Sequence, residues 1–268
     1  MNVKNRKMTN LCVTVITKNE QGNIGACLDS VEFADERVVL DSGSTDRTRE
    51  IVGSSNAVLV HGADWPGFGP QKNRALEHAS GRWVLSIDAD ERVSPELAVE
   101  ISSAIQNADA QGRKIAFEIP RLTQFCGVWI RHCGWTPDYV LRLFKRGEAR
   151  FSDDLVHEKL LLIDPETEII RLKTQLLHYS YPSPEHYWRK LQQYSQDWAK
   201  QKYKEGKKVS IVRALVSGVV AFLRSYVFRL GFLDGAMGLA VCTMQAQAAF
   251  GKYFELYYLN LQDAKKHT

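Results

Sequence analysis

Acidic side chains follow short apolar runs of this 268-residue sequence, and one such pair is spaced for metal chemistry. The run WVLSI leads directly into Asp88-Ala89-Asp90. Residues i and i+2 of an extended segment point to the same side, so both carboxylates can face one point in space. Two carboxylates this close repel each other unless a cation lies near them. Mg²⁺ and Mn²⁺ suit such a site because they prefer oxygen ligands and leave positions free for a diphosphate. A turn whose acids only cap a following helix is the alternative.

A second polar segment, DSGSTDRTREI, begins where the apolar run VVL ends. Ser44, Thr45 and Asp46 are residue types that cap helices, and a helix is expected from about Asp46. Capping leaves Asp41-Ser42-Gly43 without a role. The small residues at this turn let a flat ligand approach closely, so the segment is a second candidate for binding.

Both segments belong to an alternating pattern of strands and helices. Runs typical of strands span 11–16, 38–40, 57–60 and 83–87, and helix-compatible stretches lie at about 24–31, 46–52, 70–78 and 95–107. This order predicts a doubly wound α/β sheet, mainly parallel, with helices on both faces. Ligands of such sheets bind beyond the carboxyl ends of the strands, where the acidic segments would converge. Shorter strand candidates after residue 115 make the predicted sheet mixed.

Charge is unevenly distributed along a chain of ordinary globular composition, 44% hydrophobic and 25% charged. Residues 189–268 hold 13 Lys/Arg and 5 Asp/Glu, whereas residues 1–188 hold 22 and 26. From about Pro184 onward the pattern is helical. We therefore expect two domains, a catalytic one over 1–183 and a basic, amphipathic helical extension over 184–268.

The basic extension predicts an anionic partner. A helix is expected over 209–230, and four polar residues form one narrow stripe along it: Ser210, Arg213, Ser217 and Arg224. The remaining faces are apolar, and several lysines precede the helix, which suits an anionic membrane surface. Nucleic acid is not favoured, because the lysines are not interleaved along a groove-binding face. A packed bundle or a dimer interface is the alternative.

Two apolar runs bear on membrane insertion and export. The uncharged run 214–223 is half of the about 20 residues that span a bilayer, which argues against a transmembrane helix. The run 11–16 is too short for the core of a signal peptide. A peripheral protein on the cytoplasmic face of the inner membrane is therefore expected.

Longer blocks of the sequence carry a family resemblance. They are VTVITKNEQGNIGACLDSV, VVLDSGSTDRTREI, PGFGPQKNRALEHASGRWVLSIDADE and FSDDLVHEKL, and together they cover about residues 11–160. In order and spacing they resemble the inverting family 2 glycosyltransferases, whose nucleotide-sugar-binding fold is called GT-A. The later pattern LLHYSYPSPEHYWRKLQQYS with RLGFLDGAMGLAV is similar to the lipopolysaccharide core β-1,4-glucosyltransferases, which place glucose on an inner-core heptose. The resemblance implies a GT-A-type doubly wound, mixed and mainly parallel sheet with a helical C-terminal extension.

The resemblance also implies roles for the polar segments. The nucleotide part of a UDP-sugar would be bound by Thr17, Asn19, Glu20, Asp41 and Ser44. Asp41 would hydrogen-bond the uracil or ribose. Lys72 and Arg74 would approach the nucleotide or its phosphates, unless they lie on a solvated helix face. Asp88 would face the ribose or sugar, or share the metal. Asp90 would bind the Mg²⁺ or Mn²⁺ that bridges the diphosphate.

An inverting transfer also needs a general base that removes the acceptor hydroxyl proton. By the resemblance, the base lies in the segment that contains His157 and Glu158, where this sequence has His-Glu in place of the Glu-Asp pair of processive synthases. Glu158 is the first candidate and Asp154 the second. A loop held by an internal hydrogen bond is the alternative. His178 would complete the metal site or be a core histidine.

The predicted activity is thus metal-dependent, inverting transfer of a hexose from a UDP-sugar to a lipid-linked saccharide, with glucose and a lipopolysaccharide heptose as the expected pair. Another donor and another cell-surface polysaccharide acceptor is one alternative. A nucleotidyltransferase would need a glycine- and lysine-rich loop after the first strand, which TKNEQGN does not supply. A catalytically silent sugar-binding or membrane scaffold would not need the acidic set. The oligomeric state is not predicted.

Overall fold

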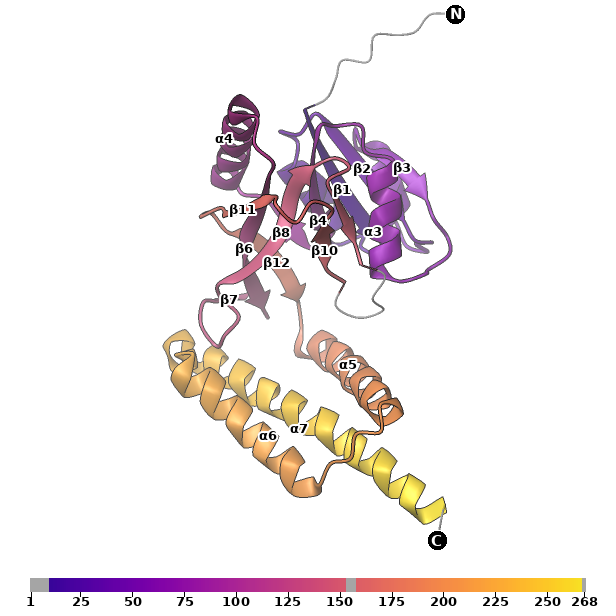
Figure 1. The fold of residues 1–268 in the computed structure, drawn as a ribbon, viewed down its shortest axis with the longest axis vertical. Coiled ribbons are helices and arrows are strands. Elements are labelled where there is room, and N and C mark those ends of the chain that lie inside the picture. Colours follow the sequence, from indigo (N-terminus) through magenta and orange to yellow (C-terminus); the bar gives the residue numbers. More distant parts are fainter. Residues whose placement is uncertain (1–9, 153–157, 267–268) are drawn as a thin grey trace, which may run out of the picture. The chain divides into compact units, whose positions relative to one another are not determined.

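The computed structural model describes residues 10–152 and 158–266. The chain groups into two compact units, one of residues up to Arg121 with Asp138–His178, the other of Leu122–Pro137 with Tyr179 onward. Figure 1 shows a sheet with helices in the first unit and a group of long helices in the second. The helical unit therefore includes a segment from the middle of the chain as well as the C-terminal part.

The main sheet is mixed and has the strand order β3-β2-β1-β4-β8-β6-β12-β5, with β7 and β11 also paired to β6. Its strands are β1 (Leu11–Thr17), β2 (Glu36–Asp41), β3 (Val58–His61), β4 (Trp83–Asp88), β5 (Glu91–Arg92), β6 (Ile115–Phe125), β7 (Val128–Ile130), β8 (Asp138–Lys145), β11 (Glu168–Arg171) and β12 (Leu176–Tyr181). A separate antiparallel pair joins β9 (Ala149–Phe151) to β10 (Leu160–Leu162). Strands β1 to β4 are parallel where they pair, and β8 is antiparallel to β4 and β6. The predicted α/β class is confirmed.

Helices cover both faces of the parallel part of the sheet. They are α1 (Ile24–Ser30), α2 (Thr48–Ser54), α3 (Phe68–Glu77) and α4 (Pro95–Gln111). Leu11, Val13 and Val15 of β1 pack in one core with buried side chains of α1, α2 and α4. Cys12 and Ile16, which alternate with them, pack on the opposite face with side chains of α3. Because successive strand residues point to opposite faces, a strand covered on both sides is almost entirely apolar, as LCVTVI is apart from Thr14.

Local capping sets the ends of α4, the helix that follows the acidic segment. Ser94 Oγ accepts a hydrogen bond from the Leu97 amide at 3.2 Å, and Pro95 occupies the first turn, where its missing N–H costs nothing. At the other end Gly112 has a φ of 63°, the left-handed conformation that ends helices. These signals place the helix directly after Asp90 and Glu91.

The helical unit contains α5 (Pro184–Lys204), α6 (Ile211–Leu223) with a π-helical turn η1 (Arg224–Phe228), a 3-10 turn η2 (Gly231–Asp234) and α7 (Gly235–Lys266). Its core gathers aromatic rings around Phe125, including Tyr181 and Tyr187, against Val241 and Cys242 of α7. A Cβ on Gly238 would lie 2.0 Å from the Gly231 carbonyl oxygen, so only glycine allows the turn to fold back this closely.

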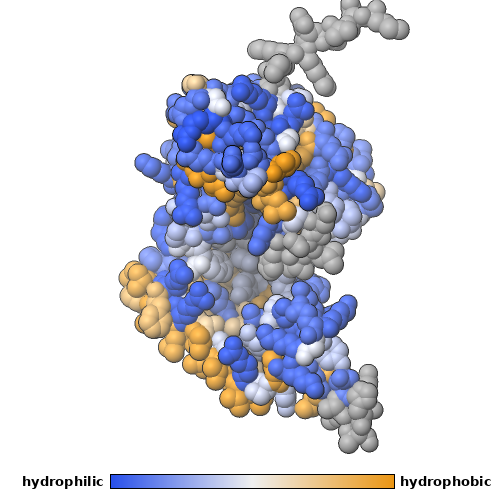
Figure 2. All heavy atoms as spheres, in the orientation of Figure 1, coloured by the Kyte–Doolittle hydropathy of each residue, from blue (hydrophilic) through white to orange (hydrophobic). Residues whose placement is uncertain are grey.

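Helix α6 and η1 form one continuous stretch, Ile211–Phe228, of which 17% is buried. By length and composition alone this stretch could cross a membrane. The uncharged run between Arg213 and Arg224 is only part of this stretch, so the apolar helix is longer than that run indicates. Figure 2 shows the apolar surface of this region as an orange band at the lower left.

Candidate active site

The ends of β1 and β2 bring two buried polar side chains side by side. Thr17 and Asp41 are partners in the strand register and are 4% and 1% exposed. Asp41 Oδ2 accepts hydrogen bonds from the amides of Gly43 and Ser44 at 3.1 and 3.0 Å. Asp41 Oδ1 and Thr17 Oγ1 are buried without a hydrogen-bond partner among the described residues. Because a buried polar atom is costly to leave unpaired, these two atoms, on residues that are partners at the ends of their strands, are candidates to bind a polar ligand.

The loops around this pair are interlocked. The Asn19 amide donates to Ser44 Oγ at 2.9 Å, and the Thr45 amide donates to Asn19 Oδ1 at 2.8 Å. Asn19 has a φ of 56°, a left-handed conformation that asparagine tolerates better than most residues. The Glu20 amide donates to Thr48 Oγ1 at 2.8 Å. Of the predicted nucleotide-binding residues, Asn19, Glu20 and Ser44 thus hold the two loops together around Thr17 and Asp41.

A chain of ion pairs occupies the end of β4. Lys72 of α3 is 5% exposed, and its Nζ lies 2.9 Å from both Asp88 Oδ1 and Glu158 Oε1. The aliphatic part of Lys72 reaches this position beside the ring of Phe151, whose centroid is 5.3 Å from Nζ. The solvated-helix alternative for Lys72 is therefore wrong. Lys72 therefore joins Asp88 and Glu158, which lie far apart in the sequence and are both predicted site residues.

Arg142 of β8 extends this chain on the other side of Asp88. One of its terminal nitrogens lies 2.7 Å from Asp88 Oδ2 and 2.9 Å from Oε1 of Glu91, which is fully buried. Glu91 Oε2 in turn accepts a hydrogen bond from the Asp88 backbone amide at 2.9 Å. Burial acts to raise the pKa of Asp88, but the Arg142 guanidinium and the Lys72 ammonium outweigh it and hold that pKa well below its usual range. Asp88 is therefore a carboxylate at neutral pH.

The predicted metal ligands are not gathered into one cluster. Asp90 Oδ2 lies 3.4 Å from His178 Nε2 on β12, whereas both oxygens of Asp88 contact cations of the protein. Over residues 10–152 and 158–266, no three His, Cys, Asp or Glu side chains are placed to hold a metal ion. Asp90 and His178 supply one carboxylate and one imidazole. That pair fits a divalent ion whose other ligands are diphosphate oxygens and water.

Two further predicted residues lie outside these contacts. Arg74 of α3 is half-buried, forms a two-bond ion pair with Asp64 at 2.7 and 2.8 Å, and donates a hydrogen bond to Gln71 Oε1 at 3.0 Å. The residue of α3 that reaches the end of β2 is instead Gln71, which is fully buried and donates to Ser42 Oγ at 2.8 Å. The second base candidate, Asp154, falls outside the described residues.

Gly69 allows the Glu158 segment to lie against α3. A Cβ on Gly69 would be 1.9 Å from the Ser152 carbonyl oxygen and 3.6 Å from Glu158 Cβ. Asn73, one helical turn along, holds the same segment through two hydrogen bonds with the Phe151 backbone at 2.8 and 2.9 Å. Glu158 is thus positioned by close backbone packing as well as by Lys72.

We expect Gly69→Ala to lower kcat/KM about 100-fold, because the added methyl must displace the segment that carries Glu158 and a shift of about 1 Å can cost that much. Gly53→Ala is the matched control, since a Cβ on Gly53 in α2 meets nothing within 4 Å. Steady-state turnover of both variants, with thermal unfolding to confirm folding, checks the expectation. Equal activity of the two variants would contradict it.

Sequence reasoning missed Arg142, Gln71 and Asn73. A signal existed for Arg142, which is the one charged residue within YVLRLF and must find partners if that strand is buried. Gln71 and Asn73 have no such signal, because polar residues on a helix are ordinarily solvated.

Comparison with known proteins indicates the family to which the chain is similar. The family model described as glycosyl transferase family 2 matches residues 12–121. An uncharacterized glycosyltransferase of Rickettsia prowazekii is 30% identical over 262 residues, covering 95% of this chain and 89% of that protein. LpsC of Rhizobium meliloti, a lipopolysaccharide core biosynthesis glycosyltransferase, is 28% identical over 276 residues, covering 96% and 98%. Among solved structures, Staphylococcus aureus TarS 1–349 in complex with UDP has a TM-score of 0.48 at 16% identity, covering 95% of this chain and 92% of that one.

Proposed function

The chain belongs to glycosyltransferase family 2, and we propose that it transfers glucose from UDP-glucose, with inversion, to a heptose of a lipopolysaccharide core. The observation that carries the proposal is the pair of unpartnered buried atoms of Thr17 and Asp41. The neighbouring strand β4 ends at Asp88, which Lys72 joins to Glu158. The similarity to LpsC over nearly the whole of both chains supports the choice of acceptor class.

A uracil ring satisfies the two unpartnered atoms. Its N3–H donates a hydrogen bond, which suits Asp41 Oδ1, and a carbonyl oxygen beside it accepts one, which suits the Thr17 hydroxyl. Cytosine has an acceptor at N3 in place of this donor and does not match, whereas guanine carries the same N–H and carbonyl pair at N1 and O6 on a larger, two-ring base. Because Asp41 Oδ2 already accepts two backbone amides, the carboxylate is held with Oδ1 free for the base.

Asp41→Asn should weaken UDP binding roughly 10- to 100-fold, the range expected for loss of a hydrogen bond to a charged group. The two backbone amides must still meet the asparagine oxygen, so its NH₂ group faces the ligand and opposes the uracil N3–H. Cytosine has an acceptor at N3, so the variant should bind CDP better relative to UDP than the native protein does.

Calorimetric titration with UDP and CDP measures this change of preference. Asp29→Asn, at an exposed position of α1, is the control for the change of charge. An unchanged ratio of UDP to CDP affinity in Asp41→Asn would place the base elsewhere.

The transfer step follows from the ion-pair chain. We propose that Glu158 takes the proton of the acceptor hydroxyl as its oxygen attacks the anomeric carbon, while the bond to the UDP oxygen breaks on the opposite face. Lys72, held 2.9 Å from Asp88 and Glu158, keeps both carboxylates at one site and offers a positive charge to the departing phosphate. Asp88, which stays ionised, would accept hydrogen bonds from the ribose or the sugar.

Asp90 and His178 would hold Mg²⁺ or Mn²⁺ together with the diphosphate. A divalent ion there would offset the negative charge that develops on the leaving UDP. His178 lies on β12 opposite Glu91 of β5, so the strand pairing itself fixes the imidazole beside the acidic segment. The hypothesis that His178 is only a core histidine is less favoured, because its side chain is 15% exposed and faces Asp90.

The proposed site of action is the inner face of the bacterial cytoplasmic membrane, with a lipid-linked saccharide as acceptor. The exposed apolar stretch Ile211–Phe228 supports this placement. Arg213 and Arg224 lie on that stretch, and charged side chains within a membrane-spanning segment are unfavourable unless they reach its interface with water. A helix lying in the membrane interface keeps both arginines near lipid phosphates, so we favour peripheral binding over a span.

A further inference from the structure

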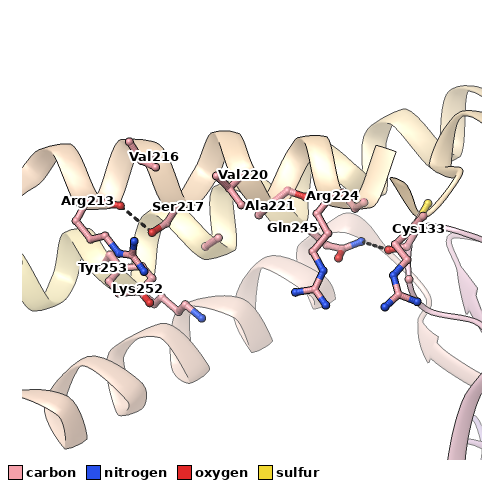
Figure 3. A pocket seen from close by; sticks show the side chains of 14 residues that line it. Cys133, Arg213, Val216, Ser217, Val220, Ala221, Arg224, Gln245, Lys252 and Tyr253 are labelled. Carbon is pink, nitrogen blue, oxygen red and sulfur yellow. Dashed lines mark hydrogen bonds between the residues drawn. The ribbon is translucent and has the colours of Figure 1, made fainter. Parts of the chain in front are cut away.

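The helical unit contains a basic pocket of about 390 Å³ that the proposed reaction does not use. It lies between α6, α7 and the loop at Cys133 and Gly134. None of its lining residues is acidic. The four cations that line it are Arg213, Arg224, Arg229 and Lys252. Figure 3 shows Arg213, Arg224 and Lys252 extending from the two helices on the same side of α6.

The four cations have no carboxylate partner in the described part of the chain. Arg213 and Lys252 instead contact the ring of Tyr253, at 5.6 and 5.5 Å from its centroid, and Lys252 lies 5.1 Å from that of Trp198. Aromatic faces hold cations in place without neutralising them. Like charges on the lining of one pocket repel one another, so an anion bound between neighbouring cations would be stabilised.

The geometry of α6 indicates what the anion is attached to. Six exposed aliphatic residues form one continuous arc of the helix: Val212, Leu215, Val216, Val219, Val220 and Leu223. Arg213 and Arg224 occupy the next arc, and Val216 and Val220 line the pocket itself. Phe228, just beyond, is 78% exposed. An apolar surface therefore begins at the edge of the basic pocket.

We propose that this pocket binds the phosphate-bearing headgroup of a membrane lipid, whose acyl chains contact the exposed arc of α6. Guanidinium groups match phosphate oxygens with paired hydrogen bonds, and two or more of them can share one headgroup. The proposal rests on the proposed function in one respect, that the protein acts at a membrane surface. It adds the chemical group of the lipid that the protein would bind there. It does not depend on which sugar is transferred.

Binding of monomeric dihexanoyl phosphatidic acid tests the pocket without a membrane surface. The native protein should bind it in one-to-one stoichiometry by calorimetry, and Arg224→Gln/Lys252→Gln should weaken binding about 30-fold, since each basic group contributes roughly fivefold near an anionic lipid. Lys200→Gln/Lys204→Gln removes the same charge from exposed positions of α5 outside the pocket. This control should retain native affinity, because salt at physiological strength screens charges beyond about 8 Å.

Two further probes separate a lipid from a free anion. Flotation with phosphatidylcholine vesicles that contain phosphatidylglycerol should show native binding and loss in the pocket variant. Inorganic phosphate should bind much more weakly than the short-chain lipid. Equal losses in both double variants would assign binding to diffuse charge and overturn the proposal. So would phosphate binding as tight as lipid binding, or no binding of any probe.

Transfer to a water-soluble, deacylated oligosaccharide separates this inference from the proposed function. The pocket variant should retain that transfer while losing lipid binding. If the native protein binds the lipid but transfers no sugar, the proposed reaction alone is contradicted. If it transfers sugar but does not bind the lipid, the proposed lipid pocket alone is contradicted.

Discussion

Glu158→Gln should lower kcat by about 10²- to 10⁴-fold, the contribution of a positioned general base, with little change in the KM for the donor. The amide has nearly the shape of the carboxylate and can still accept the Lys72 hydrogen bond, which is 2.9 Å long in the structure. It cannot take a proton from the acceptor hydroxyl. The loss should therefore fall on the chemical step and leave donor binding and folding unchanged.

Two variants provide comparisons for this result. Glu166→Gln, at an exposed position between β10 and β11, makes the same chemical change away from the site and should behave as the native enzyme. Asp154→Asn tests the second base candidate. A large fall in kcat for Asp154→Asn, together with near-native turnover of Glu158→Gln, would transfer the role of base to Asp154.

Arg142→Met should reduce the free energy of unfolding by about 3–5 kcal/mol at pH 7, the cost of breaking a buried ion pair by removing one partner. Arg142 is 5% exposed and contacts both Asp88 and Glu91, so its loss leaves two carboxylates without their principal cation. Urea unfolding followed by circular dichroism measures the difference. Arg150→Met, at an exposed position of β9, should stay within about 0.5 kcal/mol of the native protein.

The effect of Arg142→Met should shrink in acid. The folded-state pKa of Asp88 lies well below its unfolded value of about 3.9, so this carboxylate stabilises the fold above that pH and the stabilisation is lost as pH falls through the folded pKa. Below about pH 4 the variant protonates Asp88 more readily than the native protein does, which removes the unpaired charge. A destabilisation that is equal at pH 7 and pH 4 would contradict the charge-based explanation.

The parallel half of the fold was predictable because each strand there is covered on both faces. A mainly apolar run such as LCVTVI can then be recognised without knowing its partners, and a cluster of polar residues marks where it ends. The strand β5, two residues long, and β11 carry no such pattern and form only because neighbouring strands present free edges. The prediction of helix from Pro184 onward is confirmed, while the inclusion of residues 122–137, with the end of β6 and β7, in the helical unit was not predictable.

Parts of the candidate site were predictable to different degrees. Asp41 and Asp88 end strands and Asp90 follows one, so the rule that ligands bind at strand ends selects them directly. Lys72 was selected by family resemblance, but its position between Asp88 and Glu158 depends on how α3 packs against a segment about 80 residues further along the chain. Arg142 pairs with Asp88 across 54 positions of sequence, and no local pattern encodes such a pairing.

Release of nucleotide from a panel of UDP- and GDP-sugars tests the central claim most directly. The purified protein would be supplied with truncated lipopolysaccharide acceptors, with Mn²⁺ or Mg²⁺ and with EDTA, and the linkage of the product read from its anomeric NMR signals. The account predicts turnover of UDP-glucose that requires both the metal and a heptose-bearing acceptor and yields a β-linked product. Turnover of another donor would keep the family and change the substrate. Folded protein that turns over no donor with any acceptor would contradict the account.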